Sequence, residues 1–139
     1  MHTIMVVDDD PIIIDGLCML LKRIEPTSVV LVAKSGADAL GILLEQPVEL
    51  ILTDIKMPVM DGLELIENLR MLHFQGEVVI ISGFDDFELV RKALQLGASD
   101  YLLKPVKSDE LERVCKACFE RLQSKRYRSL ALDGQASTN

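Results

Sequence analysis

The feature that most restricts the fold of this chain is a fivefold alternation of short apolar runs with longer segments of helical spacing. Three of the runs, near residues 3–7, 50–53 and 78–81, are apolar at almost every position instead of alternating with polar residues. Such runs are typical of strands in a parallel sheet that is covered on both faces. We therefore predict an α/β fold with a doubly wound parallel sheet and helical crossovers between successive strands.

The expected elements account for most of the chain. Strands are predicted at 3–7, 29–33, 50–53, 78–81 and 101–103, and helices at 11–24, 37–45, from about 62, 87–96 and 108–125. After about residue 124 the sequence becomes basic and then polar, without an apolar stripe. We expect one domain over residues 1–124, followed by a linker stub or disordered tail over 125–139.

Composition bounds the class of protein. With 139 residues, 49% of them hydrophobic, the chain is long enough for one domain with one core. A net charge of −7 argues against binding to nucleic-acid phosphates. No apolar run is long enough to cross a bilayer, and the acids at 8–10 interrupt any secretory signal, so we expect a cytoplasmic protein with no membrane partner.

The three cysteines are Cys18, Cys115 and Cys118, and an odd number without a secretory signal indicates reduced thiols. Cys115 and Cys118 have the C-x-x-C spacing of redox and metal sites. However, they share helical spacing with Leu111 and Leu122, and no second cysteine pair or nearby histidine completes a zinc site. We therefore predict that both thiols are packed in the core.

Polar side chains follow the predicted strands at their carboxyl ends. Asp8 and Asp9 follow the first strand, Asp54 the third, Ser82 the fourth and Lys104 the fifth. In doubly wound sheets, ligands bind beyond these strand ends, so the five side chains are expected at one site. Carboxylates, a hydroxyl and an amine are the groups needed for Mg²⁺-dependent phosphoryl transfer.

Four segments in this order resemble the receiver domain of two-component response regulators. They are Val7–Pro11, Asp54–Gly62, Ile81–Phe84 and Asp100–Pro105, and the resemblance extends over about residues 3–123. It implies a flavodoxin-like (βα)5 three-layer sandwich whose five parallel strands lie in the order 2-1-3-4-5.

The resemblance also implies roles for the acids. Asp54 matches the aspartate that accepts the phosphoryl group. Asp8, Asp9, Asp54 and the backbone carbonyl of Lys56 match the ligands of Mg²⁺, for which Mn²⁺ can substitute. Electrostatics also favours a cation among these acids, because clustered carboxylates repel one another and a hard divalent cation relieves that repulsion.

Three further residues match the family's pattern. Ser82 and Lys104 correspond to the hydroxyl and ammonium that contact the phosphoryl group, and Ser82 and Tyr101 to the pair that switches conformation. The transition state requires neutralisation of charge on the phosphoryl oxygens, which Lys104 and Ser82 are suited to supply together with the cation. The bond before Pro105 is expected to be cis, as it is in the family.

The resemblance implies a sensor histidine kinase as phosphoryl donor, and it leaves open a homodimer formed on phosphorylation. Residues 82–88 and 97–106 are similar to receivers joined to AraC-type DNA-binding domains. No helix-turn-helix fits the short tail, so DNA contact would require an output domain absent from this chain. A stand-alone receiver, or a different output domain, remains an alternative.

Two other functions would use parts of the same sequence pattern. A haloacid-dehalogenase-like phosphohydrolase would use Asp8 and Asp10, but the fifth residue of that motif is missing and Asp54 would have no role. A flavodoxin-like cofactor binder lacks a glycine-rich phosphate loop after the first strand. We do not expect an enzyme: the only reactions that the domain should catalyse are its own phosphorylation and dephosphorylation. We interpret His2 and His73 as surface residues, and Asp10 as a turn or helix-cap residue.

Overall fold

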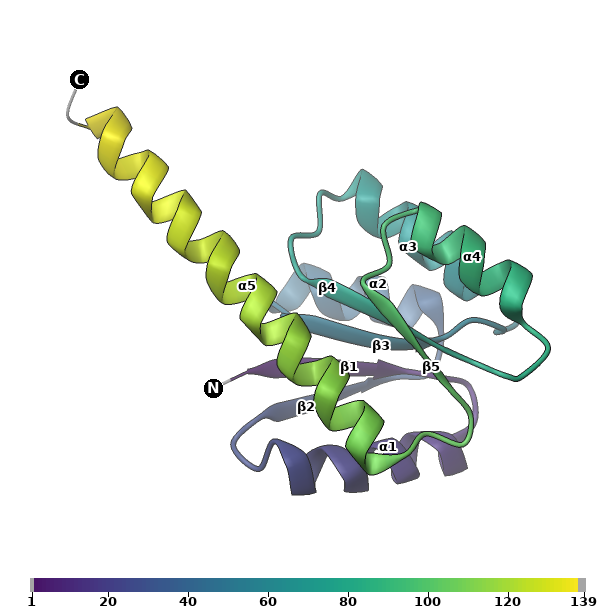
Figure 1. Cartoon of the computed structure of the whole chain (residues 1–139). Helices are drawn as coiled ribbons and strands as arrows, with labels where there is room; N and C mark the ends of the chain where they lie inside the picture. The colour runs from purple at the N-terminus through teal and green to yellow at the C-terminus, as the bar shows by residue number, and fades with distance from the viewer. Residues whose placement is uncertain (1, 138–139) are drawn as a thin grey trace.

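Five parallel strands form one sheet with helices on both faces in a computed structural model of the protein (Figure 1). The structure describes the backbone of residues 2–137 and the side chains of residues 2–131. The elements are β1 (Thr3–Val7), α1 (Pro11–Ile24), β2 (Val29–Ala33), α2 (Gly36–Glu45), β3 (Leu50–Asp54), α3 (Gly62–Met71), β4 (Glu77–Ser82), α4 (Phe87–Gln95), β5 (Asp100–Leu103) and α5 (Ser108–Ser137). The strand order is β2-β1-β3-β4-β5, so the predicted fold class and order are confirmed.

The sheet separates two apolar cores. Along β1, Ile4 and Val6 point toward α1 and α5, whereas Met5 and Val7 point toward α2, α3 and α4. All four side chains are at most 1% exposed. Because successive residues of a strand face opposite sides, burial on both faces requires the continuous apolar runs seen in the sequence.

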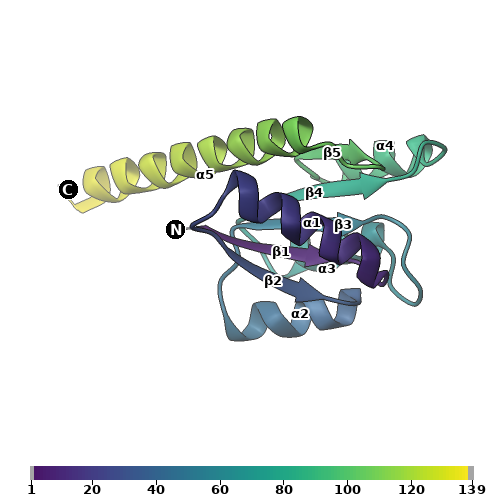
Figure 2. The ribbon, with the colours of Figure 1, turned by 90° about the horizontal axis from the view of Figure 1, so that it is seen from below.

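Helix α5 is longer than the sequence predicted. We expected it to end near Lys125 and to be followed by a structureless segment, but it continues to Ser137 and projects beyond the body of the domain (Figures 1 and 2). From residue 123 to residue 131 every side chain is exposed. The loss of the apolar stripe therefore marked the end of core contact and not the end of the helix.

The physical reason for the error is local. The segment 125–131 contains neither glycine nor proline, and its residues have moderate to good helix propensity. Arg126 also binds Glu49, with 2.9 Å between Nη2 and Oε2, which fixes the helix where it leaves the domain. Residues 138 and 139 of the predicted tail lie outside the described residues, and a domain boundary at residue 124 remains a prediction.

The buried polar groups near α5 were not foreseen. Glu77 is 6% exposed, and its carboxylate accepts hydrogen bonds from Ser99 and from the Arg121 guanidinium.

His2 was expected at the surface, but its ring stacks on Phe119 with 3.8 Å between ring centroids. The His2 side chain is still 37% exposed, but the contact was missed because the start of β1 lies beside α5 and the two residues are more than 100 positions apart in the sequence. His73 is exposed, as expected.

The C-x-x-C pair has the predicted structural role. Cys115 and Cys118 are both 0% exposed and lie in the core between α5 and the sheet. Burial raises the pKa of Cys115 to about 12 and that of Cys118 to about 11, so neither thiol is a ready thiolate at neutral pH. Among the described helices, none has both the length and the apolar character needed to span a membrane.

Candidate functional site

The carboxyl ends of β1, β3, β4 and β5 meet at one edge of the sheet. The register places Val7 beside Thr53 and Ile81 beside Asp54, while Ser82 pairs with Leu103. Residues at or just after these positions therefore converge, although they come from four separate parts of the sequence.

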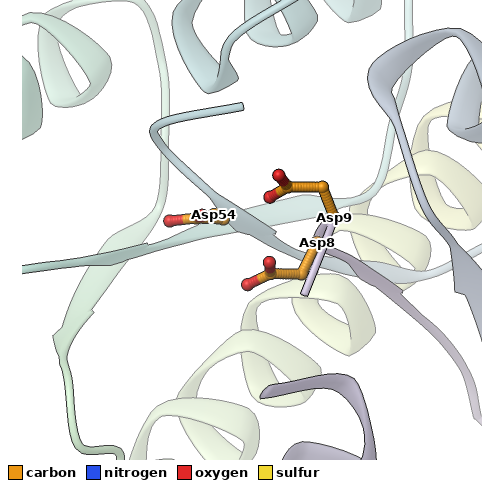
Figure 3. Close-up of side chains that lie close together, drawn as sticks. All are labelled: Asp8, Asp9 and Asp54. Atoms are coloured by element: carbon orange, nitrogen blue, oxygen red, sulfur yellow. The ribbon is translucent and has the colours of Figure 1, made fainter. Parts of the chain in front are cut away.

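Three carboxylates gather at this edge. Asp8, Asp9 and Asp54 each offer an oxygen, and these atoms all lie within 4.8 Å of one another. Figure 3 shows the three side chains at the ends of neighbouring strands, with their carboxylates facing the same side. Asp8 and Asp54 are buried, at 1% and 6% exposure, whereas Asp9 is exposed. The acidic site therefore combines two buried carboxylates, from Asp8 and Asp54, with one carboxylate that is open to solvent, from Asp9.

The buried carboxyl group of Asp8 has a raised pKa, and only one of its two oxygens has a hydrogen-bond partner among the described residues. Burial raises the pKa of its carboxyl to about 6, and the charges of Asp54 and Asp9 add to the rise. The Asp10 N–H donates to Oδ1 at 2.9 Å and opposes it, whereas Oδ2 is buried without a hydrogen-bond partner in the described part of the chain. An orphaned carboxylate oxygen beside two further carboxylates fits a hard divalent cation with oxygen ligands.

Lys104 and Ser82 lie at the same edge of the sheet as the three acids. The ammonium Nζ of Lys104 lies 3.1 Å from Oδ1 of Asp54, and the Lys104 backbone N–H donates to the carbonyl of Ser82 at 2.8 Å. The Ser82 side chain is completely buried, and its Oγ has no hydrogen-bond partner among the described residues. The Lys104–Pro105 peptide bond is cis, as expected. A carboxylate, an ammonium and an uncommitted hydroxyl therefore share one small region.

The loop between β3 and α3 folds closely around Asp54. Gly62 donates its N–H to the carbonyl of Ile55 at 2.8 Å, and a Cβ atom at Gly62 would lie 2.8 Å from the Asp54 carbonyl oxygen. Asp61 caps α3 by accepting from the Glu64 N–H at 2.9 Å. The position after Asp61 consequently requires glycine because the backbone approaches too closely for a side chain.

We expect Gly62→Ala to destabilise the domain by roughly 1–3 kcal/mol, because the new methyl group would displace the backbone that carries Asp54. A matched control is Gly41→Ala, in the middle of α2, where a Cβ would meet no atom within 4 Å. That change should stabilise the domain by about 0.5–1 kcal/mol. Chemical denaturation of both variants measures the difference, and equal effects of the two substitutions would contradict the proposed crowding.

Tyr101 lies at the exposed edge strand β5 and is 42% exposed. It borders a hollow of about 580 Å³ between β5 and α4, whose lining also includes Ser82, Phe87 and Leu103. The two residues predicted to form a switch therefore share one hollow.

One residue near the site was missed by the sequence analysis. Asp86, in the loop before α4, is 6% exposed, and its Oδ1 lies 2.7 Å from Nζ of Lys56. Its position before a helix suggests an ordinary cap, and no spacing in the sequence links it to Lys56, because the ion pair joins two loops that meet only in the folded chain.

Comparisons with known proteins agree with this geometry. A family model described as the response regulator receiver domain matches residues 4–116. The transcriptional regulatory protein HptR of Staphylococcus aureus (strain NCTC 8325 / PS 47) is 36% identical over an alignment 140 residues long. The alignment covers 94% of this chain and 53% of HptR. An uncharacterized response regulatory protein of Staphylococcus epidermidis (strain ATCC 35984 and its equivalents) is 35% identical over 127 residues, covering 88% of this chain and 48% of that protein. The chain thus spans about half the length of these curated relatives.

Solved structures give the same result. The crystal structure of a two component transcriptional regulator AraC from Clostridium phytofermentans ISDg has a TM-score of 0.80 and 30% identity, and the match covers 91% of this chain and 98% of that one. A response regulator receiver domain from Clostridium thermocellum has a TM-score of 0.82 and 27% identity, with 88% and 98% coverage. The order of strands, the acidic edge and these matches lead to one conclusion: the chain belongs to the response regulator receiver domain family.

Proposed function

We propose that this domain accepts a phosphoryl group from a sensor histidine kinase onto Asp54, with the help of Mg²⁺ or Mn²⁺, and converts that change into an altered output surface. The observation that carries the proposal is the convergence on Asp54 of Lys104, at 3.1 Å, and of the oxygens of Asp8 and Asp9, within 4.8 Å. A carboxylate in such a setting is suited to nucleophilic attack on phosphorus.

The chain's own groups have separable roles in this reaction. An oxygen of Asp54 forms the new bond to phosphorus, while the bond from phosphorus to the donor breaks and the donor leaves with its electron pair. Asp8, Asp9, Asp54 and the carbonyl of Lys56 would hold the divalent cation, which supplies positive charge against the carboxylates and the phosphoryl oxygens.

Lys104 and Ser82 act on the phosphoryl oxygens. The Lys104 ammonium already contacts Asp54 and would remain beside the acyl phosphate as a fixed positive charge. The Ser82 hydroxyl has no hydrogen-bond partner among the described residues, so it is free to donate to a phosphoryl oxygen without first giving up another bond.

The output step uses the face formed by α4 and β5. When Ser82 moves toward the phosphoryl group, it leaves the hollow that it shares with Tyr101, and the Tyr101 ring turns inward. The shared lining of that hollow supports this step. Amide chemical shifts in the beryllofluoride complex test it, because changes confined to the Asp54 pocket would contradict a switch that includes Tyr101.

The direct test of the function uses phosphoramidate and Mg²⁺ with the intact chain. We expect a mass increase of one phosphoryl group that disappears after hydroxylamine treatment, because hydroxylamine cleaves acyl phosphates and leaves phosphate esters intact. Chelation of the divalent cation should prevent incorporation. An adduct that resists hydroxylamine, or one that forms fully in the presence of EDTA, would overturn the proposal.

Control of transcription is the proposed purpose of the switch. One curated relative is a transcriptional regulator of about twice the length of this chain, which supports an output domain that binds DNA. The cytoplasmic location and a homodimer formed on phosphorylation remain predictions.

A further inference from the structure

Asp86 occupies the N-cap position of α4 but does not cap the helix. Its side chain makes no hydrogen bond to the first turn of α4, and its backbone is not extended, with φ −94° and ψ 18°. By contrast, Asp10, Ser35 and Asp61 at the starts of α1, α2 and α3 each accept a backbone N–H from the first turn. An aspartate at this position ordinarily does the same, so its carboxylate has been drawn elsewhere.

The carboxylate of Asp86 contacts two loops that flank the phosphoacceptor strand end, one at Gly83 and one at Lys56. Its Oδ2 accepts the Gly83 N–H at 2.8 Å, and its Oδ1 lies 2.7 Å from Nζ of Lys56. The short ion pair with the Lys56 ammonium lowers the pKa of the Asp86 carboxyl and raises that of Lys56, so both groups are charged at neutral pH. Lys56 follows Asp54 by two residues, and the ion pair therefore joins the loop after β3 to the loop after β4.

The second loop carries Ser82. Gly83 follows Ser82 directly, and the Asp86 N–H donates to the Gly83 carbonyl at 3.2 Å, which closes residues 83–86 into one turn. Gly83 suits this arrangement because a Cβ there would lie 3.3 Å from Oδ2 of Asp86. A displacement of Ser82 toward Asp54 must move the Gly83 N–H, and with it the bond that Asp86 accepts.

We propose that Asp86 is a positioning residue with two alternative positions, and that the Lys56–Asp86 ion pair holds the Ser82 loop in its resting place. In the resting position the carboxylate binds Gly83 and Lys56. In the released position it turns forward, accepts the N–H groups of Glu88 and Leu89, and caps α4. Both positions use the same two carboxylate oxygens, so capping α4 requires the carboxylate to give up its contacts with Gly83 and Lys56.

The energies of the two positions are comparable, as a switch requires. An N-cap and an ion pair with one exposed partner, Lys56, contribute similar amounts to stability, so a small change at the phosphoacceptor is enough to shift the balance between the two positions. A phosphoryl group on Asp54 supplies that change in two ways: it attracts the Lys56 ammonium, and it draws Ser82 away from its resting place. This inference rests on the proposed function of Asp54.

The resting half of the proposal is tested without any phosphoryl donor. In Lys56→Met, a side chain of similar length without the charge, Asp86 should move to α4, and the amides of Glu88 and Leu89 should exchange with solvent several-fold more slowly. Lys56→Arg preserves the ion pair and should resemble the wild-type domain. Lys22→Met, in the last turn of α1, controls for loss of an exposed lysine. Unchanged exchange in Lys56→Met, or equal effects of Met and Arg, would overturn the two-position assignment.

The second half is tested by the affinity for beryllofluoride in the presence of Mg²⁺. Lys56→Met and Asp86→Asn should each raise the affinity by about 2- to 5-fold, a size typical of a single partly exposed ion pair. Asparagine can still accept the Gly83 N–H and can also cap α4. The double variant should bind no more tightly than the better single variant, since both changes break one contact.

If the effects of the two substitutions on beryllofluoride affinity were additive, or if Lys56→Met bound beryllofluoride more weakly than the wild type, the Lys56–Asp86 ion pair would not be what holds the Ser82 loop in its resting place. The Lys56 side chain is 62% exposed, so Lys56→Met remains informative even if Asp86→Asn does not fold. The two proposals fail in different ways. Absence of beryllofluoride binding in the wild-type domain would refute the function of Asp54, whereas the amide exchange of α4 in Lys56→Met would still decide where Asp86 lies.

Discussion

Asp54→Asn should reduce phosphoryl incorporation from phosphoramidate by at least ~100-fold, because the amide has no anionic oxygen to attack phosphorus. Asparagine has nearly the same shape as aspartate, so the packing of this buried position should survive. The variant loses the ion pair with Lys104, whose side chain is 32% exposed, so its ammonium can be solvated instead. Intact-mass analysis with Mg²⁺ measures the incorporation, and a thermal unfolding curve confirms that the variant is folded.

Two matched controls separate chemistry from the loss of an acid. Asp10→Asn and Asp61→Asn remove the same charge from the loops on either side of the site, and both residues act as N-caps, a role that asparagine fills equally well. Both controls should take up one phosphoryl group. Undiminished incorporation in Asp54→Asn would show that another residue is the acceptor, and loss of incorporation in both controls would indicate a general effect of charge.

The strand ends explain why so much of this site could be predicted from the sequence. A parallel sheet buried on both faces needs continuous apolar runs, and its connections bring every carboxyl end to the same edge. The first polar residues after each run, among them Asp8, Asp54 and Ser82, therefore had to converge. This inference requires only local patterns together with one topological rule.

What could not be predicted depends on contacts between loops and helices. The side chains of Lys56 and Asp86 meet because two loops of particular shapes approach one another, and neither residue belongs to a periodic pattern. His2 meets Phe119 for a similar reason, since the start of β1 lies against α5. The length of α5 was misjudged because an apolar stripe reports contact with a core, whereas helix continuation depends on propensity.

Asp8→Asn should stabilise the metal-free domain at neutral pH by about 2–3 kcal/mol. The wild-type carboxyl has its pKa raised from 3.8 to about 6, chiefly by burial, which corresponds to about 3 kcal/mol against the ionised form. Asparagine keeps an oxygen for the Asp10 N–H and places an uncharged group beside Asp9 and Asp54. Chemical denaturation in the presence of EDTA measures the difference.

The dependence on pH has a definite sign. A carboxyl group whose folded pKa lies above its unfolded value favours the folded state when it is protonated. Its contribution is present in full below about pH 3.8 and is lost as the pH rises through about 6. The metal-free wild-type domain should therefore lose stability between about pH 4 and pH 7, relative to Asp8→Asn.

A divalent cation should reduce the difference in stability between the two proteins, and should reverse it once its concentration exceeds about 100 times its dissociation constant. The ionised Asp8 is then a ligand instead of an unpaired charge, so Mg²⁺ stabilises the wild-type domain by the free energy of binding and stabilises Asp8→Asn much less. Protons compete for the same oxygens, and Mg²⁺ affinity should weaken as the pH falls below about 6. If Asp8→Asn were less stable than the wild-type domain in EDTA at pH 7.5, or gained as much from Mg²⁺, Asp8 would not be the strained ligand of a cation site. On this reasoning, a cation bound at the proposed site would neutralise a buried charge that the free domain leaves unpaired, and the two measurements together test that link.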